Sequence, residues 1–174
     1  MIKVQDIVYV AHRAPDLDKH AQFLTDFGMV ETARTADRLY MRGAGTYPFI
    51  HVTEKGEPGF AGVGMLAGSA AELEEASRLP GASAIEAIEG PGGGQRVRLT
   101  APDGYRVDLV YGMTLVDPLP VRAPLPVNFA LQKQRIKSFQ RPDHEPARVV
   151  RLGHCVLKFN DGDAGARWFQ ETLG

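Results

Sequence analysis

One order of secondary-structure elements occurs twice in the first 112 residues of this 174-residue chain. Each time, an apolar strand leads into an amphipathic helix and then into three short strands, which gives the order βαβββ. We therefore predict an α+β fold in which two paired βαβββ modules form one barrel-like curved sheet. The predicted segments are residues 4–10, 16–28, 29–35, 38–41 and 49–53, then 60–67, 69–79, 84–88, 96–100 and 105–110.

Local signals mark the ends of these elements. Asp16 is a helix N-cap candidate, and Gly28 lies where the first helix should end. The run from Ser69 to Glu72 has the pattern of a capping box, which opens the second helix. Ala101-Pro-Asp-Gly104 is typical of a tight turn between the last two strands. The helix and turn boundaries thus agree with the two-module interpretation.

Residues 113–147 break the pattern. They hold six of the twelve prolines of the chain, a density that disfavours helix and sheet and favours an extended linker. The stretch from Arg122 to Arg151 carries seven Lys or Arg side chains against Asp143 and Glu145. A basic run of this kind contacts anions in some proteins, but it is more often a solvated surface, and we adopt the solvated interpretation.

A third βαβββ unit begins after the linker. In residues 151–159 the apolar pattern predicts a strand with His154 on one face and Cys155 on the other. The helix expected over residues 164–173 carries Trp168, Phe169 and Leu173 on an apolar side, which we expect to pack on the first domain or on a neighbouring chain. The domains are predicted as 1–112, a linker at 113–147, and a truncated second domain at 148–174.

Composition excludes several classes of protein. The formal net charge is −1, so no field of the whole chain favours nucleic acid or a membrane surface. Cys155 is the single cysteine, which excludes an internal disulfide. The first residues lack the pattern of a signal peptide, and no apolar run reaches the ~20 residues needed to span a bilayer. The sequence predicts a cytoplasmic protein with no nucleic-acid or membrane partner.

Three motifs together resemble the vicinal oxygen chelate superfamily, which includes glyoxalases, bleomycin-resistance proteins and extradiol ring-cleaving dioxygenases. Two of them look like openings of the family's module, and the third looks like a module ending. The openings are Ala14-Pro-Asp-Leu-Asp18 with Phe23-Leu-Thr-Asp-Phe-Gly28, and Leu152-Gly-His-Cys-Val-Leu-Lys158 with Trp168-Phe-Gln-Glu-Thr-Leu-Gly174. The ending is Ala101-Pro-Asp-Gly-Tyr-Arg-Val-Asp-Leu109.

Two modules, a linker and a further module look most like the N-terminal part of a type I extradiol dioxygenase. The resemblance implies a silent first domain and a second domain that holds Fe(II), with Mn(II) as an alternative metal, through two histidines and a glutamate. His154 matches the histidine of the first strand, and the other two ligands would lie beyond Gly174. It also implies a catechol- or dihydroxybiphenyl-like diol and O₂ as substrates, and a homo-oligomer. Three ligands on one face of the iron leave open positions for diol and O₂, so this chain alone is expected to be inactive and to hold no metal stably.

Other histidines give weaker signals. The family's ligand positions fall near Tyr9 in the first module and near Ala61 or Gly62 in the second, and none of these residues suits a metal. His51 and Asp108 lie on closing strands where ligands occur, but a structural hydrogen bond is the better expectation for His51. We assign no role to the three isolated histidines at positions 12, 20 and 144.

Two other functions stay open. The first is a non-catalytic module that uses the curved sheet to bind a small molecule or to dimerise. The second is isomerisation of the glyoxalase or epimerase type, which uses the same metal cradle together with a general base. An intact His-His-Glu set in a longer reading frame would favour an enzyme, and a stop codon after Gly174 would favour the binding module.

Overall fold

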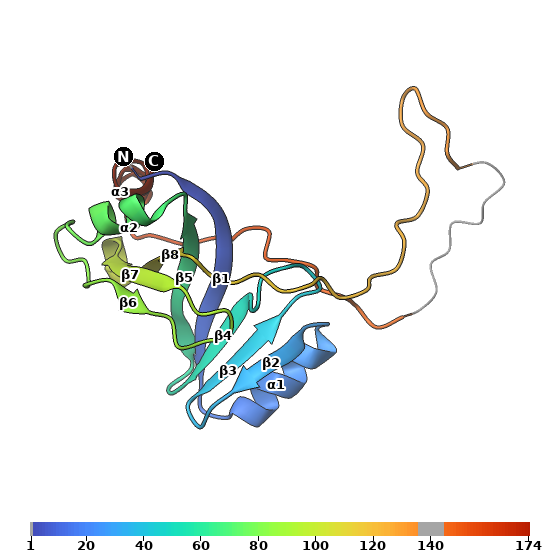
Figure 1. The fold of residues 1–174 in the computed structure, drawn as a ribbon, viewed down its shortest axis with the longest axis horizontal. Coiled ribbons are helices and arrows are strands. Elements are labelled where there is room, and N and C mark those ends of the chain that lie inside the picture. Colours follow the sequence, from blue (N-terminus) through green and yellow to red (C-terminus); the bar gives the residue numbers. More distant parts are fainter. Residues whose placement is uncertain (1, 136–144) are drawn as a thin grey trace.

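The computed structural model describes residues 2–135 and 145–174. Figure 1 shows a curled sheet with helices packed on its outer side and a long excursion of the chain to one side. The first module consists of β1 (Val4–Ala14), α1 (Leu17–Asp26), β2 (Val30–Arg34), β3 (Arg38–Arg42) and β4 (His51–Lys55). The second consists of β5 (Gly59–Ala67), α2 (Ala70–Ala76), β6 (Glu86–Ala87), β7 (Gln95–Thr100), the 3₁₀ turn η1 (Pro102–Gly104) and β8 (Arg106–Tyr111), and α3 (Gly162–Leu173) comes last.

The two modules join through their first strands. The eight strands form one sheet in the order β2-β3-β4-β1-β5-β8-β7-β6, with β1 and β5 antiparallel at its centre. Each first strand also pairs in parallel with the last strand of its own module, β1 with β4 and β5 with β8. The predicted α+β fold of two paired βαβββ modules is therefore confirmed.

The helices bury their apolar stripes on the outer face of the sheet. Leu17, Ala21 and Leu24 of α1 pack on β3 of the first module. The N-caps are those that the sequence indicates, because the Asp16 carboxylate accepts backbone hydrogen bonds at the start of α1 and the Ser69 hydroxyl does so for α2. The caps satisfy N–H groups that have no partner within the helix.

The last helix packs on the second module, as the apolar side of residues 164–173 predicts. Leu173 is buried in the same core as Leu73 of α2, and Trp168 and Phe169 pack against that core. Gly165 allows a close approach, because a Cβ there would lie about 2.5 Å from the ring of Phe159. In Figure 1, α3 lies beside α2 on the outer side of the sheet.

The strand predicted for residues 151–159 is wrong, because this segment makes no ladder with any strand of the described chain. Its side chains nevertheless alternate as expected. Cys155, Leu157 and Phe159 are partly buried, whereas His154 and Val156 are exposed. An extended segment becomes a strand only when another strand offers its N–H and C=O groups, and here none does. The described part of residues 113–147 contains no helix and one isolated bridge.

We expect Leu173→Ala to lower the free energy of unfolding by about 2 kcal/mol, since buried Leu→Ala changes cost about 2–5 kcal/mol and a helix end relaxes more readily than a core centre. Urea denaturation would measure the change. Leu131→Ala is the matched control, because Leu131 is 98% exposed and its truncation should change stability by less than about 0.5 kcal/mol. Equal effects of the two changes would contradict the packing of α3.

None of the helices in the described part of the chain has the length and apolar composition needed to cross a bilayer.

Candidate functional site

The inner face of the curled sheet centres on Tyr9 of β1 and Asp108 of β8. The Tyr9 hydroxyl donates a hydrogen bond of 2.6 Å to Oδ2 of Asp108. The two side chains are only 2% and 1% exposed, although 99 residues separate them in the sequence. They meet because β1 and β8 both pair with β5. The structure thus brings together two of the positions at which the sequence suggested metal ligands.

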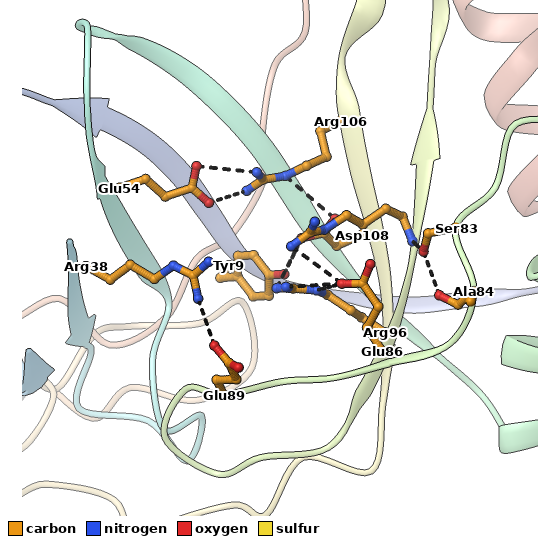
Figure 2. Close-up of polar contacts among 11 residues, drawn as sticks. Tyr9, Arg38, Glu54, Ser83, Ala84, Glu86, Glu89, Arg96, Arg106 and Asp108 are labelled. Carbon is orange, nitrogen blue, oxygen red and sulfur yellow. Dashed lines mark hydrogen bonds and ion pairs between the residues drawn. The ribbon is translucent and has the colours of Figure 1, made fainter. Parts of the chain in front are cut away.

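Three arginines surround Asp108. Arg96 and Arg98 of β7 and Arg106 of β8 place a nitrogen 3.9, 3.9 and 3.6 Å from its carboxylate oxygens. Each arginine also contacts a glutamate, since Arg96 and Arg98 contact Glu86 and Arg106 contacts Glu54. Figure 2 shows the contact between Arg106 and Glu54 at one side of this network of charges. The network has four arginines and four carboxylates, which makes it neutral overall: Arg38, Arg96, Arg98 and Arg106 with Glu54, Glu86, Glu89 and Asp108.

This environment keeps the inner groups chemically inert. Burial, together with the neighbouring Asp108 charge, raises the pKa of the Tyr9 hydroxyl well above its ordinary value, so Tyr9 stays a neutral donor. Burial alone would lower the pKa of Arg106, but its hydrogen bonds to Glu54 and the Asp108 charge outweigh burial and raise it. Arginine cannot serve as a general base at these values. Tyr9 and the arginines around Asp108 therefore supply neither a general base nor a nucleophile.

The space left beside the network is small. The cavity lined by Tyr9, Tyr40 and Phe49 with the surrounding network arginines has a volume of about 20 Å³. A cavity of that size accommodates about one water molecule. This cavity thus has no room for an aromatic diol.

His51 lies on the opposite face of the sheet from Asp108. Its ring stacks on His12 of β1 at a centroid distance of 5.1 Å and on His20 of α1 at 5.5 Å. Its Nδ1 is buried and makes no hydrogen bond in the structure. The stack was not predicted, because His12 and His20 stand isolated in the sequence. One signal was available, since His20 follows Leu17 by three positions and so borders the buried side of α1.

All three stacked imidazoles favour the neutral form. Burial, with the adjacent His12 and His20 charges, lowers the pKa of His51 to about 3. Burial also lowers the pKa of His12 and of His20. His144, the remaining isolated histidine of the sequence analysis, lies outside the described residues.

His154, the predicted metal ligand, is exposed to solvent on the segment that leads into α3. Neither Tyr9 nor Asp108 lies beside it, and no hydrogen bond of its ring is found in the described structure. Cys155 faces the protein instead, and burial raises the pKa of its thiol, as expected for an inert cysteine.

The donors present do not fit a metal site. Within residues 2–135 and 145–174, no group of three or more His, Cys, Asp or Glu side chains is arranged to hold a metal ion. On the inner face, Asp108 is already neutralised by arginines, which cannot be ligands, and Tyr9 occupies the first-strand position. A metal site in this protein would therefore need ligands from outside the first two modules.

A second hollow lies at the end of the sheet where β5 and β8 finish. It has a volume of about 510 Å³, within the size range of small-molecule sites. Tyr47, Leu66, Tyr111 and Met113 supply apolar walls, and Glu72 lies at its edge.

No protein-family model and no curated protein matches this sequence. Solved structures do match. The Mn(II)-bound glyoxalase from Novosphingobium aromaticivorans aligns with 70% of this chain at 18% identity and a TM-score of 0.63. Homoprotocatechuate 2,3-dioxygenase from Brevibacterium fuscum, in complex with 3,4-dihydroxyphenylacetate, aligns with 68% at 17% identity and a TM-score of 0.60.

The 2,3-dioxygenase LapB from Pseudomonas sp. KL28 aligns over 100% of this chain, at 22% identity and a TM-score of 0.72. The chain spans 44% of the glyoxalase, 40% of the homoprotocatechuate dioxygenase and 60% of LapB. Likenesses at these identities establish the architecture. The chain has the vicinal oxygen chelate fold, which it shares with glyoxalases and extradiol dioxygenases.

Proposed function

We propose that this chain is the N-terminal part of an extradiol ring-cleaving dioxygenase that acts with Fe(II) and O₂ on a catechol- or dihydroxybiphenyl-like diol. Residues 1–112 form a non-catalytic first domain, residues 113–147 a linker, and residues 148–174 the opening of the catalytic domain. His154 is the first metal ligand of that domain. The remaining ligands lie outside this chain, so the chain alone is inactive. We place the complete protein in the cytoplasm as a homo-oligomer.

The observation that carries the proposal is the alignment with LapB. It covers every part of this chain, linker and last helix included, and not only the two complete modules. Fold similarity confined to residues 1–112 would be expected for any protein with two paired modules. The match over residues 113–174 is instead expected for a protein whose chain continues into a second domain, and this chain covers only 60% of LapB. The sequence around His154, which resembles a module opening, adds independent support.

The geometry of the first domain supports a non-catalytic role for residues 1–112. The ligand positions hold a Tyr9–Asp108 hydrogen bond, and the cavity beside it takes about one water molecule. Catalysis by a facial triad requires open coordination positions for both diol oxygens and O₂. The first domain offers none of these, so the proposed chemistry belongs to the domain that begins with His154.

Iron content and oxygen uptake test this proposal. We expect the 174-residue chain, loaded anaerobically with Fe(II) and desalted, to retain well under one iron per chain and to consume no O₂ with catechol. The polypeptide isolated from its source should exceed 19.0 kDa, bind about one iron per chain and consume O₂. Replacing His154 by Gln in that polypeptide should abolish both properties, because a two-ligand site no longer holds the metal on one face.

Lys158→Gln is the control, since Lys158 lies on the same exposed side of the segment as His154. It should leave iron content and O₂ uptake unchanged. A source polypeptide of 19.0 kDa, or full iron content in the His154→Gln protein, would overturn the proposal.

A binding module is the second candidate. The groove of about 510 Å³ beside Tyr47 and Tyr111 favours it, because its size suits a small ligand while the inner cavity does not. Such a module would function at 19.0 kDa and would not depend on His154. The same experiment therefore separates the two functions.

A further inference from the structure

We infer that the first domain acts as a template that holds the segment around His154 at both ends, with Arg42 and Gly43 of the first module and Asp103 and Tyr105 of the second as positioning residues. The functional meaning of the template rests on the proposed function. The attachment itself is a property of this chain and can be tested without metal or substrate. We call residues 149–160 the strap.

The first attachment is the loop between β3 and β4. The backbone N–H groups of Ala44 and Gly45 donate hydrogen bonds of 2.8 Å to the carbonyls of Val149 and Val150. The Val149 N–H donates in turn to the Gly28 carbonyl at 3.1 Å. The start of the strap is thus fixed by three main-chain hydrogen bonds to the first module.

The same loop also holds the outgoing end of the linker. The Leu119 N–H donates to the Ala44 carbonyl at 2.8 Å. Arg42, which is 8% exposed, donates from Nη2 to the carbonyls of Gly45 and Asp117, both at 2.8 Å. The departing and the returning chain are thus both hydrogen-bonded at one loop.

Glycines make this contact specific. A Cβ on Gly43 would overlap the Val150 carbonyl oxygen, and one on Gly45 would lie 2.9 Å from the same atom. Real Cβ atoms essentially never approach a backbone oxygen so closely, and backbone cannot move aside as a flexible side chain can. Glycine at positions 43 and 45 therefore lets the returning chain pack directly against the backbone of this loop.

The second attachment is at the turn before β8. The Asp103 carboxylate accepts hydrogen bonds from the Asn160 backbone N–H at 2.7 Å and from its side-chain amide at 3.1 Å. Tyr105 donates from its hydroxyl to the Lys158 carbonyl at 2.7 Å and packs edge-on against the ring of Phe159. Asp103 has φ = 61°, a left-handed conformation in which the turn aims its carboxylate at the strap.

His154 lies between the two attachments. Its side chain is exposed while Cys155 on the next position faces the core, so the strap has a defined rotation as well as a defined position. Fixing a ligand before its partners arrive lowers the conformational entropy that metal binding must overcome. The template role gives a function to a domain whose own ligand positions are closed.

Hydrogen exchange of the 174-residue chain tests the attachment. Gly43→Ala should raise the exchange rates of the Ala44, Gly45 and Val149 amides about tenfold or more, because the added methyl group displaces Val150. Gly153→Ala is the matched control, since Gly153 lies within the strap and a Cβ there meets nothing within 4 Å. It should leave those rates unchanged. Equal protection in the two variants would overturn the inference.

A second variant covers the case in which Gly43→Ala fails to fold. Asp103→Gly removes both acceptors of Asn160 and retains the positive φ, which glycine tolerates. The Asn160 amide should then exchange about tenfold faster, whereas the helix amides of α1 keep their rates. Unchanged exchange at Asn160 would also overturn the inference.

Spin labels test positioning directly. With Cys155 replaced by Ser, labels at His154→Cys and Asp37→Cys should give one narrow distance distribution by double electron–electron resonance. Adding Gly43→Ala should at least double its width, a change that a purely local stabilising role would not cause. An equally narrow distribution would contradict the template. The distance measurement does not depend on iron, so an unchanged distribution would contradict the template without contradicting the proposed metal site. Conversely, a failure to bind iron would contradict the proposed function without affecting the measured distances.

Discussion

Asp108→Ala is expected to destabilise the protein by about 3 kcal/mol, because it removes the shared partner of Arg96, Arg98, Arg106 and the Tyr9 hydroxyl. Breaking a buried ion pair from one side costs about 3–5 kcal/mol, since the opposite charge stays desolvated. The lower end applies here because Arg98 is 35% exposed and all three arginines retain a glutamate partner or access to water. Urea denaturation at pH 7 measures the change.

Two further substitutions show which interaction causes the loss of stability. Tyr9→Phe removes one hydrogen bond and should cost about 1 kcal/mol. Asp37→Ala changes an exposed carboxylate and should stay within about 0.5 kcal/mol of the wild type. If Asp108→Ala lowers the free energy of unfolding no more than Asp37→Ala does, the charge network does not stabilise the inner face of the sheet.

Acidification is expected to destabilise the protein through His51. Its pKa is about 3 in the folded chain and about 6.5 when unfolded, so below pH 6.5 the unfolded state binds more protons than the folded state. The stabilising effect of the neutral ring is complete above pH 6.5 and is lost as pH falls toward 3. At pH 5 this one group lowers the free energy of unfolding by about 2 kcal/mol, at 1.36 kcal/mol per pKa unit.

Urea denaturation at several pH values between 7 and 5 measures this slope. His51→Gln should flatten the curve by about 2 kcal/mol over that interval, with the smaller effects of His12 and His20 left in place. His154→Gln replaces an exposed histidine and serves as the matched control, with the wild-type slope expected. A wild-type slope in the His51→Gln protein would show that another group causes the loss of stability in acid.

Local patterns were enough for the element order. Asp16 and Ser69 cap the helices that their positions predict, because capping depends on residues two or three positions away. The boundaries were less accurate. The strand predicted over residues 84–88 is reduced to Glu86–Ala87, since its length depends on how far β7 lies alongside it.

The candidate site was predicted only in part. The family resemblance placed ligand positions near Tyr9 and at Asp108, and the structure joins these two residues by a hydrogen bond. Nothing in the local sequence shows that three arginines of β7 and β8 enclose that carboxylate, because strand register decides which side chains meet. His51 illustrates the same limit, because successive side chains of β4 point to opposite faces of the sheet. A register shifted by one residue would place His51 on the inner face, away from the other two histidines.

The sequence by itself determined the helices, most of the strands and the alternation that points His154 outward and Cys155 inward. These features depend on neighbours within a few residues, whose interactions do not require the rest of the fold. Only the tertiary structure decided that the inner face is closed by a neutral network and that three histidines stack outside it. It also decided that residues 151–159 of the strap form no strand, because strand formation requires a second strand whose backbone pairs with it.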